Sequence, residues 1–225
     1  MKRFVPIFLA LTLLLGMTAA LLGCSGNKNP TTADNNGITI AVTSPAAHAL
    51  VRPLVKDYTE DGGTSVVTIL PLYKPGQDMH SFEPSAKDII SLAGADVVVC
   101  TGSEAWLDAA LRSSGNTVAK VVSMMEACDI HAVEHDHEHS SEDSTCALMA
   151  NDEHVWLAVD NAPLIVMAVT NALKEADPDN ASVWDKHCEA FKDQLISLNT
   201  EFRDAVSSTS KKTVVIADRH PFGHL

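Results

Sequence analysis

The feature that most constrains the fold of this chain is an alternation of short apolar runs with segments of helical spacing. Four runs rich in β-branched residues predict strands, at residues 37–44, 64–72, 95–102 and 116–124. Between them the apolar residues recur at helical spacing, at residues 47–60, 83–94 and 103–115. Alternating strands and helices of this length form a parallel sheet with helices on its faces. The sequence therefore predicts an α/β fold.

Two of these helices carry their own boundary signals. Ser85 and Asp88 have the spacing of a capping box and follow Pro84, which favours a helix start at this point. Gly94 and Gly115 stand where the two helices are expected to end, because glycine accepts the left-handed conformation of a helix C-terminus. The strand and helix boundaries are therefore defined by local chemistry as well as by periodicity.

The later part of the chain predicts a long helix followed by a new strand. Residues 154–176 have a mostly helical pattern, after which Asp177 can cap and Pro178 can open a helix that reaches about Val206. One apolar stripe follows this helix, formed by Trp184, Cys188, Phe191, Leu195, Leu198, Phe202 and Ala205. We therefore expect a first lobe, a linking helix and the start of an incomplete second lobe, at residues 38–176, 177–209 and 210–225.

The first 23 residues have the features of a lipoprotein signal peptide. Lys2 and Arg3 precede an apolar run that ends in Leu-Leu-Gly-Cys, and this ending resembles the bacterial lipobox. We expect Cys24 to receive lipid and residues 24–37, which are polar and rich in Asn, to form a flexible tether. The alternative is a plain transmembrane anchor. The prediction is an extracytoplasmic protein that is lipid-anchored to the cell membrane.

The net charge of the chain limits the kinds of partner that it is expected to bind. The formal net charge is −13, and loss of the signal peptide removes Lys2 and Arg3 but no acid. An acidic protein is repelled by nucleic acid and by anionic membrane surfaces, so neither is an expected partner. The balance instead suits a cation as ligand.

Three histidines lie in loops next to regular structure, on segments far apart in the sequence. His80 follows the second predicted strand, His154 precedes a helix, and His220 follows the last strand. Ligands of open α/β sheets bind at the carboxyl ends of the strands, where such loops meet. Neutral imidazoles suit Zn²⁺, whereas Mn²⁺ prefers more oxygen ligands. We therefore predict an interlobe zinc site, with manganese as the alternative.

A second group of histidines alternates with acids at residues 131–145. His131, His135, His137 and His139 belong to this tract, in which little apolar surface would hold them in one geometry. Such a tract binds metal loosely, with an affinity that falls as the imidazoles become protonated. We expect an accessory that gathers or senses zinc; the alternatives are a solvated acidic loop and a metal buffer that works through the tract alone.

The cysteines and the other histidines carry weaker expectations. Cys128 and Cys146 bracket the tract, and a disulfide between them is left open. Cys100 lies in an apolar strand and is expected to be a buried thiol. The pairing of Cys188 is also left open. His48 is expected at a helix start, and His187 in packing or on the surface. His224 lies too near the chain end to be assigned.

Five motifs in order resemble one known family. They are PGQDMHSFEPSAKDI, the acidic histidine-rich tract, DEHVWLAVDNA, DPDNASVW and KKTVVIADRHPFGHL, and with the lipobox they span nearly the whole chain. The chain resembles the zinc and manganese solute-binding lipoproteins of bacterial ABC importers, in the zinc-uptake branch. The resemblance implies two α/β lobes joined by a rigid helix, capture of a metal ion between them, and delivery to a permease.

The resemblance also implies a set of ligands. His80 and His154 match the first and second ligands of the family, and either His220 or Asp218 takes the third place. The family also supplies a carboxylate from later in the second lobe, beyond the last residue of this sequence. We therefore expect either a fragment of a longer protein or a truncated product with an incomplete second lobe.

The function expected from the sequence is that of a monomeric binding protein, not an enzyme. Its partners would be the permease and ATPase subunits of an importer, and its ligand Zn²⁺, with manganese or iron as the nearest alternative. A secreted zinc hydrolase would use the same histidines with Glu153 or Glu83 as base. Neighbouring residues on an extended segment point to opposite sides, so Glu153 is expected to point away from His154.

Overall fold

The computed structural model describes most of the predicted first lobe and the long helix. The described residues are 37–56, 67–132, 152–211, 213, 215 and 224. The signal peptide and most of the tether lie outside them, as do the lipidation site, most of the histidine-rich tract and two of the candidate ligands, at Cys24, His135, His137, His139, Asp218 and His220. The predictions made for these residues, and the predicted domain boundaries, remain predictions.

Within the described residues, four short strands form one parallel sheet. The strands are β1 (Ile38–Val42), β2 (Val67–Pro71), β3 (Val97–Cys100) and β4 (Lys120–Ser123). Their order in the sheet is β2-β1-β3-β4, and Ile40 of β1 pairs with Ile69 on one side and Val97 on the other. The predicted α/β fold with a parallel sheet is confirmed.

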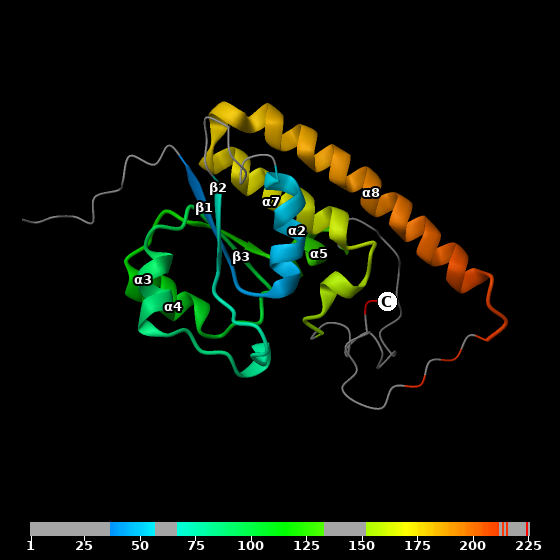
Figure 1. Cartoon of the computed structure of the whole chain (residues 1–225), viewed down its shortest axis with the longest axis horizontal. Coiled ribbons are helices and arrows are strands. Elements are labelled where there is room, and N and C mark those ends of the chain that lie inside the picture. Colours follow the sequence, from blue (N-terminus) through cyan, green and yellow to red (C-terminus); the bar gives the residue numbers. More distant parts are fainter. Residues whose placement is uncertain are drawn as a thin grey trace, which may run out of the picture. The chain divides into compact units, whose positions relative to one another are not determined.

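Helices cover both faces of this sheet. The α-helices are α2 (Pro45–Val55), α3 (Ala86–Leu92), α4 (Leu107–Ser114), α5 (Met124–Ala132), α7 (Ala162–Ala176) and α8 (Ala181–Ser207). Helices α3 and α4 lie on one face, and α2, α5 and α7 on the other, with α8 packed outside against α7 and α2 (Figure 1). The buried residues accordingly form two clusters, one on each side of the sheet.

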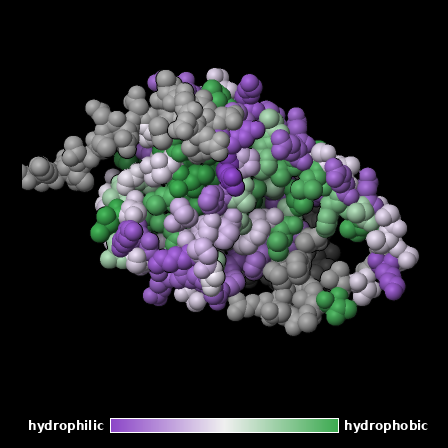
Figure 2. Space-filling model, viewed as in Figure 1, coloured by the Kyte–Doolittle hydropathy of each residue, from purple (hydrophilic) through white to green (hydrophobic). Residues whose placement is uncertain are grey.

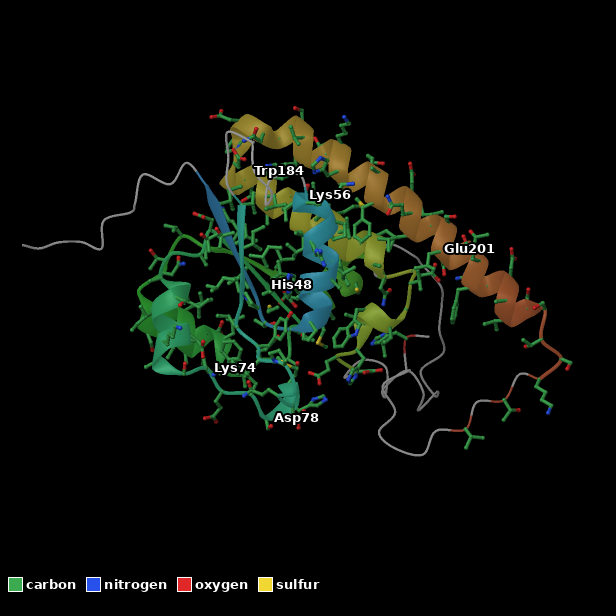
Figure 3. All side chains as sticks on the ribbon, in the orientation of Figure 1. His48, Lys56, Lys74, Asp78, Trp184 and Glu201 are labelled. Carbon is green, nitrogen blue, oxygen red and sulfur yellow. The ribbon has the colours of Figure 1, made fainter. Side chains whose placement is uncertain are left out.

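Trp184 anchors the start of the long helix α8. Its side chain is fully buried in the larger core cluster, together with Cys188 of the same helix, at the place labelled in Figure 3. The next helical positions of the predicted stripe, Phe191 and Leu195, also pack against this core. Burial of a side chain as large as Trp contributes several kcal/mol, on the order of the loss seen when such a residue is truncated to Ala.

The second half of the stripe on α8 is exposed. Leu198 and Phe202 are 52% and 43% exposed, and Ala205 is also exposed. Hydrophilic residues lie along α8 with hydrophobic residues between them on the face shown in Figure 2. The first half of the predicted apolar stripe is therefore a buried face, and the second half is exposed.

Two local expectations about helices were wrong. A helix, α5, begins directly after β4 and extends through His131, so the predicted loop at 131–145 starts inside a helix. A 3-10 turn at Pro178–Asn180 separates Asp177 from α8, so Asp177 does not cap the long helix. Its carboxylate instead accepts a hydrogen bond from the Asn180 side chain at 2.7 Å.

The capping box of α3 and the glycine end of α4 are confirmed, whereas Gly94 follows α3 without a left-handed conformation. The Ser85 hydroxyl accepts from the Asp88 backbone N–H, and the Asp88 carboxylate accepts from the Ser85 backbone N–H, which completes the capping box. Partial burial disfavours the charged Asp88 carboxylate, but the Ser85 hydrogen bonds and nearby lysines outweigh it and lower its pKa. Gly115 ends α4 in the left-handed conformation, at φ 73°.

None of the helices in the described part of the chain is both long and apolar enough to cross a bilayer.

Candidate metal centre

The candidate centre lies at the carboxyl edge of the sheet. An open cavity of about 930 Å³ is lined by the residues that follow β1, β2 and β3, and by the segment around His154. The chain runs from β1 outward to β2 and then crosses to β3 on the other side, so the strand order reverses at this point. Open α/β sheets bind ligands at such a reversal. The cavity therefore lies at the carboxyl edge of the sheet, where the sequence predicted the site.

His80 is presented by a single 3-10 turn in the loop after β2. This turn spans Met79–Ser81 and is capped by Asp78, whose carboxylate accepts a hydrogen bond from the His80 backbone N–H at 3.1 Å. Figure 3 labels Asp78 at this end of the sheet. The His80 side chain is 39% exposed, so its ring is held at the mouth of the cavity rather than in the core.

His154 is held by a second aspartate in the same relative position. The Asp152 carboxylate accepts the His154 backbone N–H at 3.0 Å and lies 2.7 Å from Nδ1 of the ring. Because a carboxylate only accepts, Nδ1 carries the proton in this contact and Nε2 keeps a free lone pair. The ring also packs against Trp156, with centroids 5.3 Å apart. His154 is therefore fixed in tautomer and orientation.

Glu153 joins the two histidines, contrary to the expectation from sequence. Its Oε1 atom lies 2.6 Å from Nδ1 of His80, and one potential ligand atom from each of His80, Glu153 and His154 lies within 4.8 Å of the others. The glutamate side chain is long enough to turn its carboxylate toward His80, so the prediction that Glu153 points away from His154 is wrong.

The loop that carries His154 is also tied to the long helix. Asp160, which follows the 3-10 turn, accepts hydrogen bonds from Asn199 and Arg203 of α8. Closer to His154, the Asn161 side chain donates to the Val155 carbonyl at 2.9 Å. These contacts hold the short described segment directly before α7, which presents the second histidine.

Another carboxylate in the cavity wall is already committed to the backbone. The Glu104 side chain accepts from the backbone N–H groups of Thr101 and Gly102, at 2.9 and 2.8 Å, and from the Thr43 hydroxyl. It thereby ties together the ends of β1 and β3. Its role is to shape the cavity edge.

The other described histidines form contacts outside this cluster. His48 lies in the first turn of α2 with Nδ1 2.7 Å from the Tyr73 hydroxyl, and His187 packs against α2 with Nδ1 2.7 Å from the Leu54 carbonyl. His224, which the sequence left unassigned, donates from Nε2 to the Asp152 carbonyl at 2.7 Å. Of the two roles left open for His187, surface or packing, its contact with Leu54 favours packing.

Cys100 is a buried thiol, as predicted. It is 3% exposed at the end of β3, and burial, with the nearby charges of Glu104 and Glu126, raises its pKa to about 12. Burial and these charges therefore disfavour the thiolate, which is the form that binds metals. Cys146 lies outside the described residues, so its pairing with Cys128 stays a prediction.

The structure brings together two of the predicted ligands and adds residues that the sequence reasoning missed. His80 and His154 lie in one cluster, with ring centroids 5.6 Å apart. The missed residues are Glu153, Asp152 and Asp78. A signal for the two aspartates was available, because each histidine stands second after an aspartate, in Asp-Met-His and in Asp-Glu-His. An aspartate side chain commonly bonds to the backbone two residues later.

The sequence of this chain is similar to those of known proteins. The sequence model of a family described as the zinc-uptake complex component A, periplasmic (ZnuA), matches residues 51–225. The manganese ABC transporter substrate-binding lipoprotein scaA of Streptococcus gordonii is 23% identical over 220 residues, covering 94% of this chain and 66% of the relative. The high-affinity zinc uptake system protein ZnuA of Bacillus subtilis is 26% identical over 207 residues, covering 90% and 62%.

Solved structures agree in fold. A crystal structure of ZnuA matches with a TM-score of 0.59 at 20% identity, over 77% of this chain and 60% of that chain. A zinc-bound deletion mutant of ZnuA matches with a TM-score of 0.60 at 20% identity, over 78% and 61%. The chain thus spans less than two thirds of the length of these relatives. Several relatives are named as ABC transporter substrate-binding lipoproteins, and the resemblance seen in the motifs is confirmed: the protein belongs to the ZnuA family.

Proposed function

We propose that this protein captures a divalent metal ion, foremost Zn²⁺, at the carboxyl edge of its sheet and hands it to a membrane importer. The observation that carries the proposal is the cluster of His80, Glu153 and His154, whose ligand atoms lie within 4.8 Å of one another. Two imidazoles and a carboxylate suit zinc, which binds nitrogen and oxygen at about 2.0 to 2.2 Å. His80 and His154 are the proposed first and second ligands.

The charge of the cavity favours a cation. Four carboxylates line it, from Asp78, Glu83, Glu104 and Glu153, and none of its described lining residues is Lys or Arg. A cleft lined by one sign of charge concentrates ions of the opposite sign. The net charge of −13 acts in the same direction.

The third position of the predicted site remains a proposal from the family resemblance. His220 or Asp218 would approach His80 and His154 from the second lobe, and a fourth position would be taken by water or by a further carboxylate, as tetrahedral zinc requires. The relatives include proteins named for manganese and for zinc, which supports both ions as ligands. Zinc is proposed first because imidazoles dominate the set.

The proposed partners follow from the same relatives. Substrate-binding components of ABC importers act with a permease and an ATPase, and several relatives are named as lipoproteins. We propose the same assembly here, with lipid on Cys24 and the protein outside the cytoplasm. Binding is proposed rather than catalysis, because Glu153, a candidate base for a hydrolase, lies against His80 as a member of the cluster.

Removal of the tract imidazoles tests this division of roles. The variant replaces His135, His137 and His139 with Asn in the chain from Ser25 onward, and leaves His131 in place because it lies in α5. We expect one tight zinc site in the wild type and in the variant, with weak additional sites lost only in the variant. Calorimetric zinc titration with a competing chelator measures both classes of site. Loss of the tight site in the variant would assign metal binding to the tract and refute the proposal.

A further inference from the structure

Glu153 stands between Asp152 and His154 in the sequence, and the family resemblance assigns it no role. We propose that Glu153 is a third protein ligand of the captured metal, so that the first lobe alone supplies two imidazoles and one carboxylate. This inference rests on the proposed function, which it deepens by adding a ligand and a metal preference.

The positions of the three side chains support direct ligation. Glu153 Oε1 lies 2.6 Å from His80 Nδ1, and the ligand atoms of His80, Glu153 and His154 all lie within 4.8 Å of one another. Ligand atoms around a tetrahedral zinc ion are about 3.4 Å apart, given metal distances of about 2.0 to 2.2 Å. Small side-chain rotations therefore bring the three atoms around one ion.

The local backbone keeps Glu153 on the side of the histidines. Asp152 accepts hydrogen bonds from the backbone and the ring of His154, and the 3-10 turn begins immediately afterwards. Glu153 stands between these two fixed points and reaches across to His80, which belongs to the loop after β2. Two ligands from one rigid segment lose little conformational freedom when metal binds.

The environment of Glu153 also calls for a cation. Its side chain is 20% exposed, and none of the described residues lining the cavity around it is Lys or Arg. A partly buried carboxylate is stabilised by a countercharge, and a divalent ion between Glu153 and the two imidazoles supplies it. Glu83 lines the same cavity but is exposed and lies outside the three-residue cluster.

An oxygen ligand changes the expected selectivity. Mn²⁺ and other hard cations prefer oxygen donors, whereas imidazole suits zinc. With Glu153 in the set, Mn²⁺ gains a carboxylate that His80 and His154 cannot provide. Loss of Glu153 is therefore expected to weaken Mn²⁺ binding more than Zn²⁺ binding.

The test compares Glu153→Gln with Glu83→Gln in the chain from Ser25 onward, which retains every described residue. Both variants remove one carboxylate charge from the same cavity. Zn²⁺ affinity is measured by chelator competition, Mn²⁺ affinity from the resonance signal of free Mn²⁺, and the ligand set from the visible spectrum of bound Co²⁺. Circular dichroism verifies folding, and Glu153→Asp, which keeps a carboxylate, serves as the second variant.

We expect Glu153→Gln to weaken Zn²⁺ binding by about 100-fold or more, since even residues that only support a ligand contribute 10- to 100-fold. Its Mn²⁺ loss should be larger, its Co²⁺ spectrum should change, and Glu153→Asp should recover part of the affinity. Glu83→Gln should alter each affinity less than about threefold. An unchanged Co²⁺ spectrum in Glu153→Gln would mean that Glu153 only positions His80, and affinities equal to those of Glu83→Gln would mean no role; either result overturns the proposal. If the wild type itself has no tight site, it is the proposed function that fails.

Discussion

Zinc affinity is expected to fall by at least about 1,000-fold when His80 and His154 are both replaced by alanine. The two rings lie with centroids 5.6 Å apart at the edge of one cavity, and each is held by an aspartate that precedes it by two positions. Removal of one supporting residue of a metal ligand costs about 10- to 100-fold, so removal of two ligands costs more. Zinc titration of both proteins with a competing chelator measures the loss.

The matched control for this double variant removes two histidines outside the cluster. His48 and His187 contact the Tyr73 hydroxyl and the Leu54 carbonyl, and both lie in described helices. A His48→Gln, His187→Gln protein removes the same number of imidazoles and is expected to bind zinc as the wild type does. Equal losses in both double variants would mean that binding follows the number of histidines rather than their place in the fold.

A second large effect is expected from Asp152→Asn, which should weaken zinc binding by about 10- to 100-fold. The Asp152 carboxylate accepts the proton on Nδ1 of His154 and so leaves Nε2 available to the metal. The asparagine side chain can turn an N–H donor toward this nitrogen, which favours the other tautomer. The same chelator competition measures the change.

Asp78→Asn is the comparison for this prediction. The Asp78 carboxylate bonds to His80 by accepting its backbone N–H, and the amide oxygen of asparagine can accept the same bond. We expect its zinc affinity to stay within about threefold of the wild type. If Asp78→Asn weakens zinc binding as much as Asp152→Asn does, general disturbance of the loops, and not control of the His154 tautomer, explains both effects.

Much of the fold was predictable because it depends on local signals. The run Val97–Cys100 is a fully buried strand, and its β-branched side chains predict a strand from the sequence alone. The capping box of Ser85 and Asp88 was predictable for the same reason, since its geometry depends on four consecutive residues. Helix α5 was missed because it follows β4 with no intervening turn residue to separate the two elements.

The candidate site was predictable only in part. His80 and His154 could be chosen because both lie in loops beside regular structure, at an edge where parallel strands end. Glu153 was assigned the wrong direction because the alternation of side chains describes how each side chain leaves the backbone, whereas the long glutamate side chain places its carboxylate beside His80. Contact between Glu153 and His80 joins residues 73 positions apart, and no local pattern carries it.

The apolar stripe on α8 illustrates the same limit. Periodicity placed Trp184 and Leu198 on one apolar stripe, yet Trp184 is fully buried and Leu198 is 52% exposed. Burial depends on which elements pack against each half of the helix, and α2 and α7 pack against it where Trp184 lies. A helical period predicts a face but not the length over which that face is covered.

Locating the metal ion itself gives the sharpest test of the proposed site. Crystals of the zinc-loaded chain from Ser25 onward, measured at the zinc absorption edge, give an anomalous map in which only zinc appears strongly. If the proposed site is right, the highest peak of this map lies within bonding distance of both His80 and His154, at the carboxyl edge of the sheet. A highest peak that contacts neither histidine would contradict it.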